Sequence, residues 1–183
     1  MAAAKKDENA VEDSLTVQLQ QLALATSDTV EVYCGVSAPN NGQQDCESAY
    51  ACHFPSCPTW NVAEKIESEH QTNMRTVLHA GIAALKTLKQ HEDDLPKNII
   101  VYARDEYLVK MMNVRVDQWE RNGWKKSNKN RPENLDLVKQ LYQLRGSLSR
   151  AVKWKKVEQG SGDADGFIDK ANRMAAQANL TEP

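Results

Sequence analysis

The sequence has no long hydrophobic segment. No apolar run approaches the roughly 20 residues that a membrane-spanning helix needs, and Ala2–Asn9 lacks the apolar core of a secretory signal. Internal repeats and low-complexity blocks are also absent. These absences predict no membrane association and an intracellular protein, in the nucleus or the cytoplasm.

Cysteine is scarce, and neither sign of charge dominates. A framework of disulfides is excluded because 183 residues contain only 4 cysteines, which we expect to be free thiols in a reducing compartment. The 23 Lys and Arg residues against 25 Asp and Glu residues give a net charge of -2. That balance excludes a protein that coats nucleic acid through its overall charge. With 40% hydrophobic and 26% charged residues, the chain has the composition of a globular protein.

Several familiar catalytic and metal-binding patterns are missing as well. There is no Gly-rich phosphate loop and no Ser/His/Asp constellation. The cluster of Cys46, Cys52, His53 and Cys57 lacks the paired spacing of a zinc site. Adjacent residues of a strand point to opposite faces, which separates Cys52 from His53. We therefore expect buried thiols beside a surface histidine, with no metal and no cofactor.

The first 28 residues differ from the rest of the chain. Met1–Asp13 is small and charged, and it predicts a flexible segment. Leu15, Leu19 and Leu22 fit one face of a helix, although the same stretch also alternates as a strand would. We predict a flexible extension over residues 1–28 with a short amphipathic segment. Its three leucines either bind a partner protein or cover the protein's own sheet.

From residue 29 onward, strand-like and helix-like patterns follow one another. Three segments with a period of two predict an antiparallel meander: Thr29–Cys34, Ser48–Phe54 and Thr59–Ile66. Helical spacing occurs in four segments: Thr72–Lys89, Glu106–Asn122, Asn134–Gly146 and a last helix around Ala171–Ala178. The apolar run Asn98–Ala103 predicts a central parallel strand, and Val152–Val157 a fifth strand. We expect one domain over residues 29–179, a mixed sheet with helices on its faces, and a tail at residues 180–183.

Four segments on different predicted elements carry a family resemblance. The longest is Trp119–Leu141, WERNGWKKSNKNRPENLDLVKQL, which joins a basic loop to a helix. The others are Val30–Ser37 on the first strand, Thr72–Leu85 on the first long helix and Ile168–Ala171 on the last helix. In this order and spacing they resemble the cellular-type ribonuclease H family. The resemblance implies an α/β fold, with a five-stranded mixed sheet flanked by helices.

The resemblance also implies a position for each catalytic residue. The family hydrolyses the RNA strand of an RNA–DNA hybrid with two divalent cations held by four acidic residues. The matching positions here are Gly35, Val77, Arg104 and Asp169, and a loop histidine falls near Gln159. Only Asp169 is acidic, and one carboxylate does not offset the charge of two cations.

Arg104 would place a permanent cation where a metal ion is expected. We expect it to form an ion pair with Asp169. An alignment shifted by one residue would instead bring Asp105 to this position, but it would still leave the cluster two ligands short. These replacements predict that the protein is not an enzyme.

Positive charge is concentrated in Lys110–Arg131. Seven basic residues against two acidic ones give this segment a charge of +5. In the family the corresponding protrusion contacts nucleic acid, so the resemblance names the following candidate nucleic-acid-binding residues: Lys125, Lys126, Lys129, Arg131 and, on the first long helix, Asn73. Trp119 and Trp124 are expected to pack the protrusion rather than to stack on bases.

Three functions are compatible with this sequence. The first is a catalytically inactive ribonuclease H-like domain that acts as an adaptor or scaffold for one or more proteins, in a nucleic-acid-related complex. The second is a non-cleaving protein that binds RNA or RNA–DNA hybrid through the basic protrusion. The third is an active metal-dependent hybrid ribonuclease with rebuilt metal ligands.

Overall fold

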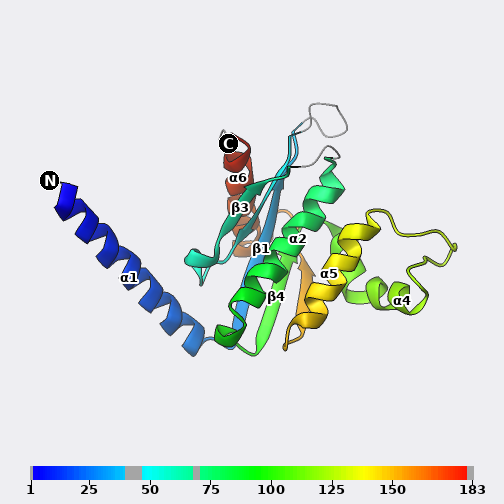
Figure 1. Ribbon diagram of the computed structural model, residues 1–183, viewed down its shortest axis with the longest axis horizontal. Coiled ribbons are helices and arrows are strands. Elements are labelled where there is room, and N and C mark those ends of the chain that lie inside the picture. The colour runs from blue at the N-terminus through cyan, green and yellow to red at the C-terminus, as the bar shows by residue number, and fades with distance from the viewer. Residues whose placement is uncertain (1, 40–46, 68–70, 181–183) are drawn as a thin grey trace.

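A five-stranded mixed sheet forms the centre of the protein (Figure 1). The computed structural model describes residues 2–39, 47–67 and 71–180. The strand order is β3-β2-β1-β4-β5, and the strands are β1 (Thr29–Ser37), β2 (Ala49–His53), β3 (Val62–Lys65), β4 (Asn98–Ala103) and β5 (Val152–Lys156). β1, β2 and β3 pair antiparallel, and β4 pairs parallel with both β1 and β5. The predicted α/β fold, meander and central parallel strand are confirmed.

Helices cover both faces of the sheet. α2 (Asn73–Gln90) packs on β1 and β2, and α5 (Leu135–Ser147) packs against α2. α6 (Asp163–Leu180) crosses β1, β2 and β3 on the opposite face. The alternation of β1 fits these two layers, because Val32 belongs to the core under α2 while Tyr33 packs with Ile168 of α6.

The predicted single helix after β4 consists of three consecutive segments. They are α3 (Glu106–Lys110), the π-helical η3 (Met111–Arg115) and α4 (Val116–Arg121). A π-turn is wider than an α-helical turn and redirects backbone groups. Here the Met112 carbonyl accepts a hydrogen bond of 2.9 Å from Arg145 Nη1, and the Asn113 side chain bonds to the backbone of β5. These contacts fasten the segment to α5 and to the sheet.

Two predictions in the meander need correction. The predicted strand over Thr59–Ile66 is shorter, because the 3-10 helix η1 (Pro58–Trp60) precedes β3. His53 is only 3% exposed, because α6 covers its face of the sheet and places the Phe167 ring 5.7 Å away. Burial lowers the pKa of His53, and the nearby Lys170 lowers it further. Cys34, Cys52 and Cys57 are buried free thiols as expected, whereas Cys46 lies outside the described residues.

The N-terminal segment forms the helix α1 (Ala2–Thr26), which contains the predicted amphipathic stretch with Leu15, Leu19 and Leu22. Its C-terminal end packs against η1, and the rest of α1 projects away from the sheet (Figure 1). Leu24 and Gln20 are buried there, and Thr59 Oγ1 donates a 2.6 Å hydrogen bond to Gln20 Oε1. This segment forms a helix rather than a strand, despite its alternating pattern, because Ala, Gln and Leu all have high helix propensity.

In the part of the chain that the structure describes, no helix is both long and apolar enough to cross a bilayer. Helix η2 (Glu92–Asp94) links α2 to the segment before β4. The end of α6 includes Leu180, the first residue of the predicted tail, and residues 181–183 lie outside the described range.

Candidate functional site

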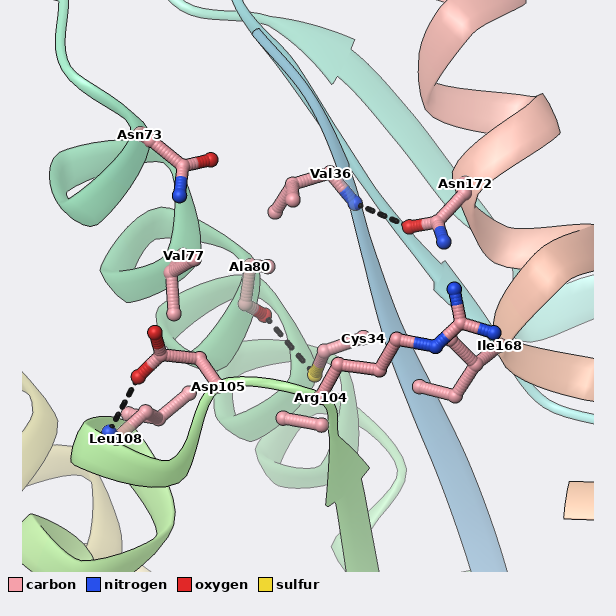
Figure 2. Close-up of a pocket in the computed structure, with 11 residues that line it drawn as sticks. Cys34, Val36, Asn73, Val77, Ala80, Arg104, Asp105, Leu108, Ile168 and Asn172 are labelled. Carbon is pink, nitrogen blue, oxygen red and sulfur yellow. Dashed lines mark hydrogen bonds between the residues drawn. The ribbon is translucent and has the colours of Figure 1, made fainter. Parts of the chain in front are cut away.

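A cavity of about 310 Å³ opens at the C-terminal ends of β1 and β4 (Figure 2). Its floor is largely apolar and includes Val36, Val77, Leu108 and Ile168. Its polar lining consists of Asn73, Arg104, Asp105 and Asn172. Of the four positions at which the sequence resemblance placed acidic residues, Val77 and Arg104 line this cavity, and Gly35 and Asp169 are sequence neighbours of the lining residues Val36 and Ile168. Gln159 is exposed in the connection between β5 and α6 and does not line this cavity.

Gly35 lies where α6 crosses β1. A Cβ atom on Gly35 would lie 2.3 Å from the backbone carbon of Ala171 and 2.4 Å from the backbone nitrogen of Asn172. The Val36 N–H donates a hydrogen bond of 2.9 Å to Asn172 Oδ1, which holds α6 in this position. Helix α6 thus packs directly on the backbone of β1, and no side chain fits between them.

Arg104 connects the end of β4 to α6. Its Nη2 donates to Asp169 Oδ1 at 2.9 Å and also to Asp165 Oδ1. The predicted pair with Asp169 is confirmed. Asp165 was missed, although its place one helical turn before Asp169 was a usable signal. The guanidinium of Arg104 faces both carboxylates, so their negative charge is balanced without a further cation.

Hydrogen bonds to charged forms shift the pKa values of this group. The pKa of Arg104 is raised, first by its hydrogen bond to Asp165. The pKa of Asp165 is lowered, first by the backbone N–H of Gly160 and then by Arg104. Both shifts favour the charged states that form the pair.

Asp105 has a different task from the one that a shifted alignment would assign to it. Its carboxylate accepts a 2.7 Å hydrogen bond from the Leu108 N–H and caps the start of α3. Figure 2 shows Arg104 reaching across towards α6 while the Asp105 carboxylate lies on the α3 side of the cavity. The two neighbours therefore serve different elements, and Asp105 does not take the place of Arg104.

The side chains around this cavity do not fit a pair of divalent cations. Gly35 has no space for a ligand, Val77 is apolar and 6% exposed, and Arg104 presents a positive charge. A two-metal site needs several oxygen ligands to offset the charge of its ions. Among the described residues, no group of three or more His, Cys, Asp or Glu side chains is arranged to hold a metal ion.

A basic arm, residues 122–134, extends between α4 and α5 (Figure 1). Lys125, Lys129 and Arg131 are exposed on it, and Lys126 is half-buried. The arm carries its own backbone hydrogen bonds, one of 2.8 Å from the Lys126 N–H to the Asn130 carbonyl. The predicted cations therefore project from an ordered turn.

Two tryptophans fix the base of this arm. Trp119 is 5% exposed and belongs to the main core, and Trp124 packs edge-on against Tyr142 with 5.4 Å between ring centroids. Lys139 Nζ lies 5.4 Å from the centre of the Trp124 ring, which adds a cation–π contact. Arg145 of α5 also pairs with Asp117 of α4. Both tryptophans thus pack at the base of the arm, as expected.

A second cavity, of about 700 Å³, lies between the basic arm and the first cavity. Its lining includes Asn134 at the end of the arm and Asn73 at the start of α2, and Asn73 also lines the first cavity. Arg75 bridges these elements through Asn134 at 3.2 Å and Asp136 at 2.9 Å. Asn73 thus connects the two cavities, one lined by the end of the arm and the other by Arg104.

Known proteins resemble this chain over most of its length. The sequence model of the RNase H family matches residues 27–179. "Ribonuclease H" of Pelobacter propionicus is 30% identical over 162 residues, which cover 86% of this chain and 88% of that protein. The foamy viral protease-reverse transcriptase in complex with dsDNA matches with a TM-score of 0.68 and 14% identity, over 84% of this chain and 95% of that one. LC11-RNase H1 in complex with RNA/DNA hybrid matches with a TM-score of 0.53 and 16% identity, over 80% and 99%.

These comparisons correct one prediction. The sequence predicted that the protein is not an enzyme, because three of the four expected acidic positions are replaced. The relative that matches along most of both chains is named for an enzyme activity, and so is the matching family. The prediction is therefore wrong: it gave more weight to a few positions than to similarity along the whole domain.

Proposed function

Because the chain belongs to the RNase H family, we propose that it recognises the RNA–DNA hybrid duplex and that the basic arm contacts the phosphate backbone. The exposed cations of the arm carry this proposal. Phosphate contacts by Lys and Arg supply sequence-independent affinity for nucleic acid. The chain as a whole has a net charge of -2, so its attraction for a polyanion has to be local.

The path of the duplex is suggested by the two cavities. A backbone that crosses Lys125, Lys126 and Lys129 continues past Asn134 and Asn73 towards the ends of β1 and β4. The packed tryptophans and the Arg145–Asp117 pair hold the arm in one orientation before it binds. Such preorganisation reduces the entropy lost on binding.

Hybrid binding is expected to weaken steeply with salt. The four cations of the arm, each neutralising one phosphate, predict a slope of about -3 to -4 for the logarithm of affinity against the logarithm of salt concentration. Affinity should then fall about 100-fold between 50 and 200 mM NaCl. Fluorescence anisotropy with a labelled hybrid measures this slope. Binding that ignores salt, or no binding of the hybrid, would contradict the proposal.

The same titrations identify the duplex class and the reaction. Double-stranded RNA and DNA of the same sequence serve as competitors, and the proposal expects the hybrid to compete best. Because the relatives are named ribonuclease H, cleavage of the labelled RNA strand is followed in these samples with Mg²⁺ and with Mn²⁺. If cleavage products form with the wild type but not with the Asp169→Asn variant, the reaction belongs to this chain and not to a contaminating nuclease.

A specific observation favours a second role, in protein association, for α1. Leu15, Leu19 and Leu22 are 54%, 58% and 61% exposed, and they recur at i, i+4 and i+7 along one face of the helix. Residues 14–26 contain no charged side chain, so two copies of this face meet without charge repulsion. We propose that α1 pairs with α1 of a second copy of the chain.

Replacing Leu15, Leu19 and Leu22 with Gln is expected to abolish this pairing. Glutamine retains helix propensity, so the triple variant keeps α1 but removes its apolar face. Sedimentation velocity across a range of concentrations should show a wild-type dimer and a variant monomer, with equal helix content by circular dichroism. If the wild type and the variant are both monomeric at every concentration, self-association through α1 is refuted.

A further inference from the structure

The place of Arg104 relates it to the proposed path of the nucleic acid. It follows β4 directly and lines the first cavity, whose wall it shares with Asn73. Asn73 also lines the second cavity, next to the basic arm. A duplex seated on the arm and on Asn73 therefore brings its backbone to the guanidinium.

The chemistry of the guanidinium suits a phosphate. Arginine has five N–H donors in a planar fork that matches carboxylate and phosphate oxygens. Both carboxylate contacts of Arg104 use the same atom, Nη2. The side chain is 38% exposed, so a ligand can reach part of it.

We propose that Arg104 binds a backbone phosphate of the bound duplex, at the position where the family resemblance places a divalent cation. This proposal rests on the proposed function, because it requires hybrid binding. Asp165 and Asp169 hold the guanidinium from α6, as the carboxylates of a metal site hold an ion. Arg104 then supplies a fixed positive charge in a place where the side chains do not fit two metal ions.

The proposal makes opposite predictions for the two partners of this ion pair. Arg104→Gln removes the phosphate contact, so hybrid affinity should fall about 5- to 10-fold and the salt slope should become shallower by about 1. Asp169→Asn removes a negative charge that repels the same phosphate. It keeps Arg104 tethered to Asp165, so hybrid affinity should rise about 2- to 5-fold.

The experiment measures hybrid affinity by anisotropy for the wild type and both variants, in EDTA and in Mg²⁺ at matched ionic strength. Thermal unfolding of each protein accompanies it, because losing the pair also affects stability. A wild-type affinity that is equal in EDTA and Mg²⁺, together with the opposite shifts, supports the proposal. Arg104→Lys should recover part of the affinity, since it restores the charge but not the fork.

Two other results overturn it in distinguishable ways. If the wild type binds hybrid with the expected salt slope but both variants weaken together, or neither changes, Arg104 is only a structural ion pair and the proposed function survives. If the wild type binds no hybrid, the proposed function and this inference fail together.

Discussion

Replacing Lys125, Lys126 and Lys129 with Glu is expected to lower hybrid affinity at least 100-fold. Each substitution removes a phosphate contact and adds a repulsion, and such contacts supply most of the sequence-independent affinity for nucleic acid. The anisotropy titration at about 100 mM salt measures the effect. The fold should be preserved, because Lys125 and Lys129 are exposed and the arm is held through Trp119 and Trp124.

A matched variant separates local contacts from overall charge. Lys86, Lys97 and Lys153 are exposed and line neither cavity at the proposed interface. Replacing these three with Glu changes the net charge by the same amount, and hybrid affinity should change less than about 5-fold. Equal losses in the two triple variants would show that binding depends on bulk charge and would remove the arm from the proposal.

Gly35→Ala is expected to lower the free energy of unfolding by about 3 kcal/mol. The added methyl group would meet backbone atoms of Ala171 and Asn172 at 2.3 and 2.4 Å, and backbone cannot rotate away as a side chain does. Overpacking of a dense core costs about 1–3 kcal/mol, and this site is at the severe end. The corresponding fall in melting temperature is about 6–12 °C.

Gly166→Ala, in the helix α6 that packs on Gly35, is the matched control. A Cβ at Gly166 meets no heavy atom within 4 Å, and alanine favours a helix by up to about 1 kcal/mol over glycine. Its melting temperature should stay the same or rise. A Gly35→Ala protein as stable as the wild type would mean that α6 packs less closely on β1 than the structure shows.

The same contact limits any attempt to restore an acidic residue at this position. Gly35→Asp adds a carboxylate to the Cβ that already has no room, so α6 must move before the new oxygen can reach the cavity. We expect this variant to be less stable than Gly35→Ala, both in EDTA and in Mn²⁺. A melting temperature that Mn²⁺ restores to the wild-type value would disprove this expectation.

Much of the fold was accessible from the sequence because its signals are local. The apolar run Asn98–Ala103 predicted the bounds and the central place of β4, and the helical spacing after Thr72 predicted α2. The π-helical turn at Met111–Arg115 was not accessible, since one wide turn hardly disturbs the spacing of a 16-residue helical pattern. His53 was misjudged because alternation gives the face of a residue but not the helix that covers it.

The site was only partly accessible, for a similar reason. Local charge and the family resemblance led to Lys125, Lys126 and Lys129 as predicted nucleic-acid contacts, which stay a prediction. The positions given by the resemblance led to the Arg104–Asp169 ion pair, which the structure contains. A glycine in a sequence shows the loss of a side chain but not what fills the space, so the close approach of α6 to Gly35 required the structure. The whole-chain match to an enzyme family could not be weighed from a few positions.

The hydrogen bonds of Asn113 affect how the sheet ends. β5 is an edge strand, and the backbone N–H and carbonyl of Trp154 at its centre point away from β4, where the Asn113 amide occupies both. Unpaired edges attract strands of other molecules and promote aggregation. The Asn113 side chain, from the π-helical segment, thus blocks the addition of a foreign strand to β5. This leaves the basic arm as the surface that is open to a large ligand.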